Sequence, residues 1–248
     1  MSEGKRRYQE PVPETDIAEF RKVVESRRSV RRFTDEPLPE AVLQDCLDLA
    51  MLAPNSSNLQ PWSFHIVRTP AIREGVVTAC LNQNAARTAQ ALVAVVARTD
   101  TWREHSDLNI THWPLPVVPA IVDNYYRRYA KFHYGAGPLG LKGWFKKAFF
   151  ALVGLKRPVP RGPYTQAEMN AWAVKSTALA AENFMLAMRA HGYDTCPMEG
   201  FDERRLRRLL KLPRGAIITM IIGAGRRAPD GVYHPRIRFN RERFIHDV

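Results

Sequence analysis

Residues 53–62 read Ala53-Pro54-Asn55-Ser56-Ser57-Asn58-Leu59-Gln60-Pro61-Trp62, a run rich in proline and small polar side chains. This composition is typical of a turn-rich loop, because proline and asparagine interrupt regular elements. Before it, residues 39–52 repeat apolar side chains at helical spacing, and Pro39 suits a first helical position. After it, residues 62–67 alternate large apolar residues with others, which predicts a strand. We therefore expect a helix, a polar loop and a strand in succession.

Helical periodicity recurs in three other segments, residues 15–27, 165–191 and 202–212. The long segment opens with Thr165 and Glu168 at the spacing of a capping box, and Gly192 is expected to end it. Its middle is apolar almost all round, so it should be the central helix of the core.

Two short apolar runs, residues 92–97 and 217–222, predict buried strands. The few strands lie between helices of different lengths, which indicates an α+β or mixed α/β class. The length of 248 residues suits one domain, with an insertion at about 100–164.

Composition narrows the possible partners without selecting one. Lys and Arg outnumber Asp and Glu by 37 to 25, a formal net charge of +12 that favours phosphates, nucleic acid or an anionic membrane surface. Three distant cysteines, with no CxxC pair, give neither a disulfide framework nor a zinc motif. No apolar segment follows the basic opening, so no secretory signal is expected, and the reducing cytoplasm is the default location.

The insertion contains an aromatic and basic segment, residues 137–155, that has two interpretations. Lysines interrupt this segment, so its uninterrupted apolar stretch is too short to span a bilayer. It forms either a helix packed over a pocket or subunit interface, or an amphipathic helix lying on a membrane surface. Prolines and glycines predict several rigid pieces rather than one long helix, and the aromatic side chains suit stacking on a flat acceptor.

A second polar segment, residues 26–33, reads Ser26-Arg27-Arg28-Ser29-Val30-Arg31-Arg32-Phe33. Arginine forks provide the charge-assisted donors that bind phosphate. The hydroxyls and amides of residues 55–60 would suit a polyhydroxyl chain or a heteroaromatic edge. The alternative is a solvated arginine cluster and a simple turn, and the residues alone leave both open.

Together these segments resemble the motifs of the FMN-dependent nitroreductase family. Two further stretches agree, one at residues 196–202, Cys196-Pro197-Met198-Glu199-Gly200-Phe201-Asp202, and one in the basic tail, Pro235-Arg236-Ile237-Arg238-Phe239. The resemblance covers roughly residues 15–100 and 165–240 and leaves out the insertion. It implies an α+β sandwich with a mostly antiparallel sheet, and an intertwined homodimer that binds FMN at the subunit interface.

The resemblance also implies a set of cofactor-binding residues. Contacts to the phosphate and ribityl chain are expected from Arg27, Arg28, Ser29, Arg236 and Arg238, and Arg31 is expected near the pyrimidine edge. Ala85 stands where some members carry a lysine, so that edge would depend on Arg31 alone. Contacts from the other subunit are expected from the loop residues Pro54, Asn55, Ser56, Ser57 and Asn58. Asn82 is expected to make a polar contact with the flavin. The backbone of the motif at 196–202 is expected to lie beside the flavin ring, through Pro197, Met198, Glu199 and Gly200.

The implied activity is hydride transfer from NAD(P)H through FMN to an electron-poor acceptor such as a nitroaromatic or a quinone, with ping-pong kinetics. No catalytic acid or nucleophile is expected from the protein, since the flavin carries the chemistry. Alternatives are other FMN-dependent chemistries, namely dehydrogenation or reductive dehalogenation, and a basic protein that binds nucleic acid or a membrane surface. A metal site is not expected, because the histidines lack metal-binding spacing, and Cys196 is expected to be a small buried residue.

Overall fold

The computed structural model describes residues 8–135, 137 and 140–248. In this part of the chain an antiparallel sheet of four strands has the order β1-β2-β4-β3. The strands are β1 (Trp62–Ile66), β2 (Ala91–Arg98), β3 (Asp194–Met198) and β4 (Ala216–Gly225). This is the antiparallel α+β sheet expected from the resemblance.

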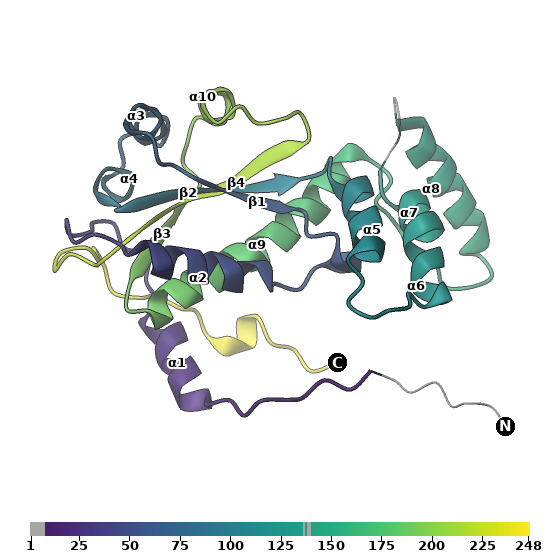
Figure 1. The fold of residues 1–248 in the computed structure, drawn as a ribbon, viewed down its shortest axis with the longest axis horizontal. Helices are drawn as coiled ribbons and strands as arrows, with labels where there is room; N and C mark the ends of the chain where they lie inside the picture. The colour runs from purple at the N-terminus through teal and green to yellow at the C-terminus, as the bar shows by residue number, and fades with distance from the viewer. Residues whose placement is uncertain (1–7, 136, 138–139) are drawn as a thin grey trace.

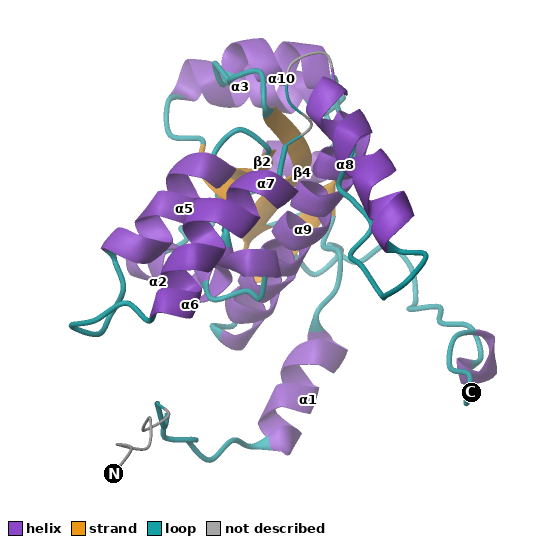
Figure 2. Ribbon diagram, turned by 90° about the vertical axis from the view of Figure 1, so that its right-hand side faces the viewer, coloured by secondary structure: helices purple, strands orange, loops and turns teal. Residues whose placement is uncertain are grey.

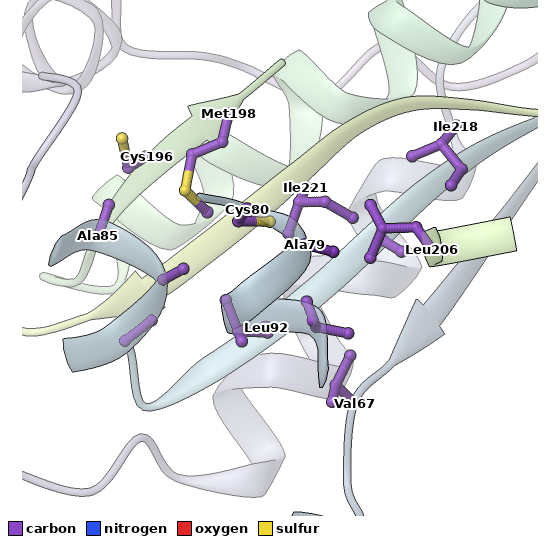
Figure 3. Close-up of a cluster of buried hydrophobic side chains, with 14 of the residues drawn as sticks. Val67, Ala79, Cys80, Ala85, Leu92, Cys196, Met198, Leu206, Ile218 and Ile221 are labelled. Atoms are coloured by element: carbon purple, nitrogen blue, oxygen red, sulfur yellow. The ribbon is translucent and has the colours of Figure 1, made fainter. Parts of the chain in front are cut away.

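Helices cover both faces of the sheet (Figure 1). One face carries α3 (Pro70–Ala79), α4 (Asn84–Thr88) and α10 (Glu203–Leu209), and the other carries α2 (Glu40–Met51) and α9 (Gln166–Ala190). β2 is buried on both faces, as expected. Its consecutive residues Leu92 and Val93 point to opposite faces of the sheet and enter different hydrophobic clusters. Figure 3 shows the cluster beneath α3 and α10.

The helix signals in the sequence are confirmed with two adjustments. Asp16 caps α1 (Ile17–Ser26) by accepting from the N–H groups of residues 18 and 19, and Gly192 follows α9 with φ 84°. Thr165 caps α9, but the Glu168 carboxylate accepts from the N–H of Tyr164, one residue before the position expected for a capping box. α10 ends at Leu209, three residues earlier than expected, because the chain turns before Pro213.

Three elements were not predicted from the sequence. α3 and α4 lie between the first two strands, in a stretch whose apolar residues are mostly alanine and valine and give a weak periodic signal. β3 coincides with the third family motif and contains Pro197, which argues against a central strand. The sheet order resolves this point, since β3 is an edge strand and tolerates a proline.

Two terminal arms extend from this body (Figure 2). α1 has no buried residue, and its apolar side chains Ile17 and Phe20 are 69% and 56% exposed. The tail, residues 233–248, is exposed along its whole length and includes Phe239 and Phe244. The apolar side chains of both arms therefore lack cover from their own chain.

The insertion folds into several helical pieces, as expected. They are α5 (Trp102–Thr111), α6 (Ala120–Asn124), a π-helical turn (Tyr125–Ala130), α7 (Lys131–His133) and α8 (Leu141–Val153). Of the segment 137–155 discussed above, residues 138 and 139 lie outside the described residues. Within the described ranges, no helix is long and apolar enough to cross a membrane.

Close backbone packing holds α8 against the rest of the insertion. A Cβ on Gly143 would lie 1.7 Å from the carbonyl oxygen of Tyr164, so only glycine fits there. One turn on, the buried Lys146 Nζ donates to the carbonyl oxygens of His133 (2.6 Å), Gly135 (3.1 Å) and Pro163 (2.6 Å). These three acceptors match the three protons of the ammonium group and fix the inner face of α8.

Candidate functional site

The arginine-rich segment, residues 27–33, lies along the outer edge of β3. The N–H of Val30 donates to the carbonyl oxygen of Thr195 at 3.0 Å, and Ser29 forms a parallel bridge with Thr195. Side chains alternate along this extended backbone, so Val30 is buried while Ser29 and Arg31 are exposed. The fold thereby turns the hydroxyl and guanidinium groups of this segment away from the core.

The C-terminal tail crosses the same segment. The Arg28 Nη2 donates to the carbonyl oxygen of His234 at 2.5 Å, and the Arg236 guanidinium donates to the carbonyl oxygen of Arg27. A cavity of about 430 Å³ lies between them, lined by Arg28, Ser29, Arg31, Val232, Tyr233, His234 and Pro235. Residues some two hundred positions apart in sequence thus form one surface.

A second cavity of about 420 Å³ borders the other side of Arg28, with Glu25, Ser26, Arg189, Arg227 and Arg236 in its walls. Arg189 and Arg227 share one counter-charge, the buried carboxylate of Asp194, at 2.9 and 2.6 Å, so the three groups together keep one positive charge. Arg27 Nε lies 3.7 Å from Glu182 Oε1. In the described ranges no comparable carboxylate pairs with Arg28, Arg236 or Arg238.

The electrostatics show that these guanidinium groups repel one another. Partial desolvation lowers the pKa of Arg236, and the nearby charges of Arg238, Arg28 and Arg27 lower it further, against a smaller opposing effect of Glu25. An anion placed among them would reduce this repulsion and accept charge-assisted hydrogen bonds. The arrangement therefore has the charge and the donors that an anion would require.

The carboxyl end of β3 lies further along the same edge, since the bridge between Ser29 and Thr195 places Arg28 near the amino end of the strand. Glu199 and Gly200 are exposed there, and Gln83 Nε2 donates to the carbonyl oxygen of Gly200 at 2.8 Å. The neighbouring Asn82 is exposed, and its left-handed backbone (φ 54°) is a conformation that asparagine tolerates. The tail joins the same place, since Asn84 Nδ2 donates to the Tyr233 hydroxyl at 3.0 Å.

Sequence reasoning missed Gln83 and Tyr233, whose roles depend on contacts between distant segments. Among the expected residues, Met198 and Cys196 point into the core (Figure 3), so any contact with a ligand beside β3 would come from their backbone. Ala85 is buried in the same cluster. Arg31 therefore remains the cation expected at the pyrimidine edge.

The three cysteines are buried. Burial raises the pKa of Cys46 to about 12 and that of Cys80 to about 11, and it also raises the pKa of Cys196. Thiolate chemistry is thus disfavoured at neutral pH. No group of three His, Cys, Asp or Glu side chains able to hold a metal ion occurs in the described residues.

The loop at 55–60 is held in an unusual backbone conformation. Ser57, Asn58 and Gln60 all have positive φ, at 60°, 46° and 42°, a region that serine and glutamine adopt at a cost. The Asn55 side chain braces the loop from within by accepting from the Gln60 N–H at 2.8 Å.

The insertion braces the same loop from outside. The Tyr134 hydroxyl lies 3.0 Å from Oγ of Ser56, and the Tyr125 hydroxyl lies 2.5 Å from Oγ of Ser57. Asn58 and Asn109 exchange two hydrogen bonds of 2.7 and 2.8 Å. The only sequence signal for these partners was the concentration of tyrosines in the insertion.

The loop follows the C-terminal end of α2, whereas the arginine-rich segment precedes that helix and runs along β3 (Figure 1). Among the described residues no hydrogen bond or ion pair joins the loop to the arginine cluster. Pro54, Asn55, Ser56, Ser57 and Asn58 thus form one group. The other expected residues form a second group around β3, and one chain does not bring the two groups together.

The chain belongs to the nitroreductase family, whose sequence pattern matches residues 24–226. It is 29% identical over 219 residues to an NADH dehydrogenase of Thermus thermophilus, a match that covers 88% of this chain and 91% of the relative. It is 27% identical over 196 residues to a 4-nitrobenzoate reductase of Pseudomonas putida, covering 74% of this chain and 73% of the relative.

Solved structures share the fold. A nitroreductase-like protein from Streptococcus mutans superposes with a TM-score of 0.70 at 20% identity, covering 94% of this chain and 98% of the other. A nitroreductase-type protein from Exiguobacterium sibiricum, solved in complex with FMN, gives a TM-score of 0.68 at 22% identity over 95% and 98% of the two chains. The nitroreductase fold expected from the resemblance is therefore confirmed.

Proposed function

We propose that the protein transfers hydride from NAD(P)H through a non-covalently bound FMN to an electron-poor acceptor, either a nitroaromatic or a quinone. The observation that carries this proposal is the cluster of Arg28, Arg236 and Arg238 near the amino end of β3, a cation-rich surface whose charge suits a phosphate. The names of the relatives, an NADH dehydrogenase and a 4-nitrobenzoate reductase, support the donor and acceptor classes.

As a member of the nitroreductase family, the chain is an FMN-dependent oxidoreductase that uses NAD(P)H. The residues present fit that cofactor, because the donor set combines mutually repelling guanidinium groups with the exposed hydroxyl of Ser29. FMN, when bound, supplies the redox chemistry, accepting hydride from the donor and passing it to the acceptor.

The roles of the protein residues are to bind and to orient. Arg28, Arg236 and Arg238 would hold the phosphate, with Arg27 at the margin of the cluster because its side chain faces Glu182. Arg31 would place a positive charge at the pyrimidine edge. The exposed backbone of Glu199 and Gly200, fixed by Gln83, would lie beside the ring.

We further propose that the working form is a homodimer in which the loop at 55–60 of one subunit completes the site of the other. Two observations support it. No hydrogen bond or ion pair among the described residues joins the loop to the arginine cluster, and the apolar side chains of α1 and the tail are uncovered in the single chain. Burying such side chains against a second copy would be favourable.

The flavin content of the purified parent protein and of two arginine variants tests the cofactor assignment. The protein should carry flavin absorbance and oxidise NADH or NADPH when a nitroaromatic or quinone is added. Arg28→Ala should lose flavin, whereas Arg204→Ala on the exposed face of α10 removes the same charge elsewhere and should keep it. Equal flavin content in the two variants would reject the phosphate site.

Mixed dimers test the shared site. Arg238→Ala and a chain whose residues 56–58 are replaced by alanine should each have much reduced activity alone when FMN is limiting. Co-expressed, they should regain activity, because each mixed dimer holds one site free of both lesions. Failure to regain activity in a purified mixed dimer would mean that both groups act within one chain.

A further inference from the structure

α8 has two faces of different character. Its inner face, with Gly143, Lys146 and Phe150, is buried against the insertion. Its outer face is apolar and exposed: Leu141 59%, Trp144 66%, Phe145 64%, Phe149 51% and Leu152 70%. At about 100° per residue these five side chains fall within an arc of about 140°, opposite the packed face. We call them the α8 apolar face.

Along the sequence, the charges around the α8 apolar face are of one sign; the Glu168 carboxylate acts on Lys146 of the inner face. Residues 124–167 contain nine Lys or Arg and no Asp or Glu. Lys147, Lys156, Arg157 and Arg161 are exposed near the helix. An exposed apolar stripe whose exposed charged neighbours along the sequence are basic has the pattern of a helix that lies in a lipid interface.

We propose that the α8 apolar face docks the protein on the surface of an anionic phospholipid bilayer. Trp144 and Phe145 would enter the level of the headgroups, where aromatic rings are favoured. The basic side chains would contact the lipid phosphates, an attraction that a neutral bilayer does not offer. Binding of this kind lays the helix on the membrane and needs no spanning segment.

Two other occupants fit the observations less well. A second copy docked through the same face would bring two sets of basic residues together without any acidic partner. Nucleic acid would satisfy the charges, but its backbone offers nothing to cover five apolar side chains. The face also lies at the other end of the molecule from α1 (Figure 1), so membrane docking leaves that proposed dimer arm free.

Vesicle flotation tests this proposal on the full-length protein. Vesicles of phosphatidylcholine alone are compared with vesicles in which roughly one third is phosphatidylglycerol. The protein should float with the anionic vesicles at least tenfold more strongly, and the binding should weaken as salt is raised. This measurement needs neither electron donor nor acceptor, so it is independent of the proposed hydride transfer.

Matched variants locate the contact. Trp144→Ser with Phe145→Ser should reduce anionic-vesicle binding at least tenfold, and Lys147→Glu with Arg157→Glu should do the same without loss of apolar area. Val117→Ser with Ile121→Ser is the control, because these side chains are equally exposed (76% and 80%) but lie outside α8. An unchanged melting temperature verifies that each variant is folded.

Three results would overturn the proposal. One is vesicle binding that the α8 variants leave intact or that the control variant abolishes equally. Another is a parent protein that does not bind vesicles together with α8 variants whose oligomeric state has changed. That result would mean that the α8 apolar face contacts a second copy of the chain. The third is salt-sensitive binding of duplex DNA through Lys147 and Arg157 in the absence of vesicle binding.

Discussion

The phenolic oxygen of Tyr134 lies 2.9 Å from Oγ of Ser57. This contact joins the insertion to the loop that the family resemblance assigns to the cofactor. Burial raises the pKa of the Tyr134 phenol, so the group stays protonated at neutral pH and keeps its donor. Tyr126 adds a hydrogen bond of 3.1 Å to the carbonyl oxygen of Ser57. The insertion and the loop therefore form one hydrogen-bonded unit, and the positive φ of Ser57 is stabilised from outside the loop.

Tyr134→Phe should loosen that unit. Losing a hydrogen bond of this kind costs about 1 kcal/mol, which lowers the melting temperature of a chain of this size by about 2–4 °C. Tyr129→Phe is the control, because Tyr129 stacks on Tyr125 and His133 without a side-chain hydrogen bond among those described here. Thermal unfolding followed by circular dichroism measures both, and equal melting temperatures would remove the bracing role.

Loss of a single guanidinium group should weaken flavin binding. We expect Arg27→Ala or Arg238→Ala to cost roughly 1.5–3 kcal/mol, the range for hydrogen bonds to a charged group. The effect at Arg27 should be the smaller, since its side chain also faces Glu182. Fluorescence titration of the flavin-free protein gives the two dissociation constants. Full flavin retention after dialysis of either variant would show that its side chain does not bind the phosphate.

Steady-state kinetics should be ping-pong. Donor and acceptor are expected to use one open side of the flavin in turn, and the sequence carries no second nucleotide motif. Initial rates with NAD(P)H and a nitroaromatic or quinone should give parallel double-reciprocal lines. Intersecting lines would mean that both substrates are bound at once.

Acceptor choice should depend on the insertion. A cavity of about 590 Å³ adjoins the loop at 55–60, and its walls include His105, Leu108, His112 and Trp113 from the insertion. We expect Trp113→Ala to change the ratio of kcat/KM for a nitroaromatic and a quinone by tenfold, about 1.4 kcal/mol. Trp144→Ala, on the α8 apolar face, should leave that ratio unchanged. The same shift in both variants would refute a local contact at Trp113.

Lys146 should give the protein an alkaline dependence of stability. Burial lowers the pKa of Lys146 to about 8, well below its ordinary value of 10.5. Between these values the unfolded chain binds more protons than the folded one, so the free energy of unfolding contributed by this group rises with pH. Below pH 8 both states are protonated, and the cost of holding the buried charge is present in full.

Lys146→Met isolates this contribution. The variant should be less stable overall, because three carbonyl oxygens lose their donor. Its free energy of unfolding should also lack the rise expected in the parent between about pH 8 and 10.5. The difference between parent and variant isolates Lys146, because other groups contribute equally to the two proteins. Urea unfolding at several pH values measures both. Parallel pH profiles for parent and variant would mean that the Lys146 pKa is not lowered by folding.

Local pattern in the sequence determined much of the framework. Apolar spacing and caps located α1, α2 and α9, and two short apolar runs located β2 and β4, because these signals depend only on neighbours along the chain. The four motifs likewise pointed to the family that residues 24–226 match. β3 was not predicted because Pro197 is compatible with a strand only at a sheet edge, and the position of a strand at an edge is a property of the assembled sheet.

Contacts between distant segments were decided only by the tertiary structure. The pairing of Arg28 with the carbonyl of His234, of Gln83 with Gly200 and of Tyr134 with Ser57 joins residues that have no shared periodicity. The same holds for the three carbonyl oxygens around Lys146 and for the side of α8 that remains exposed. A helical pattern shows that a side chain lies on a given face, but which face is covered depends on the packing of the whole chain.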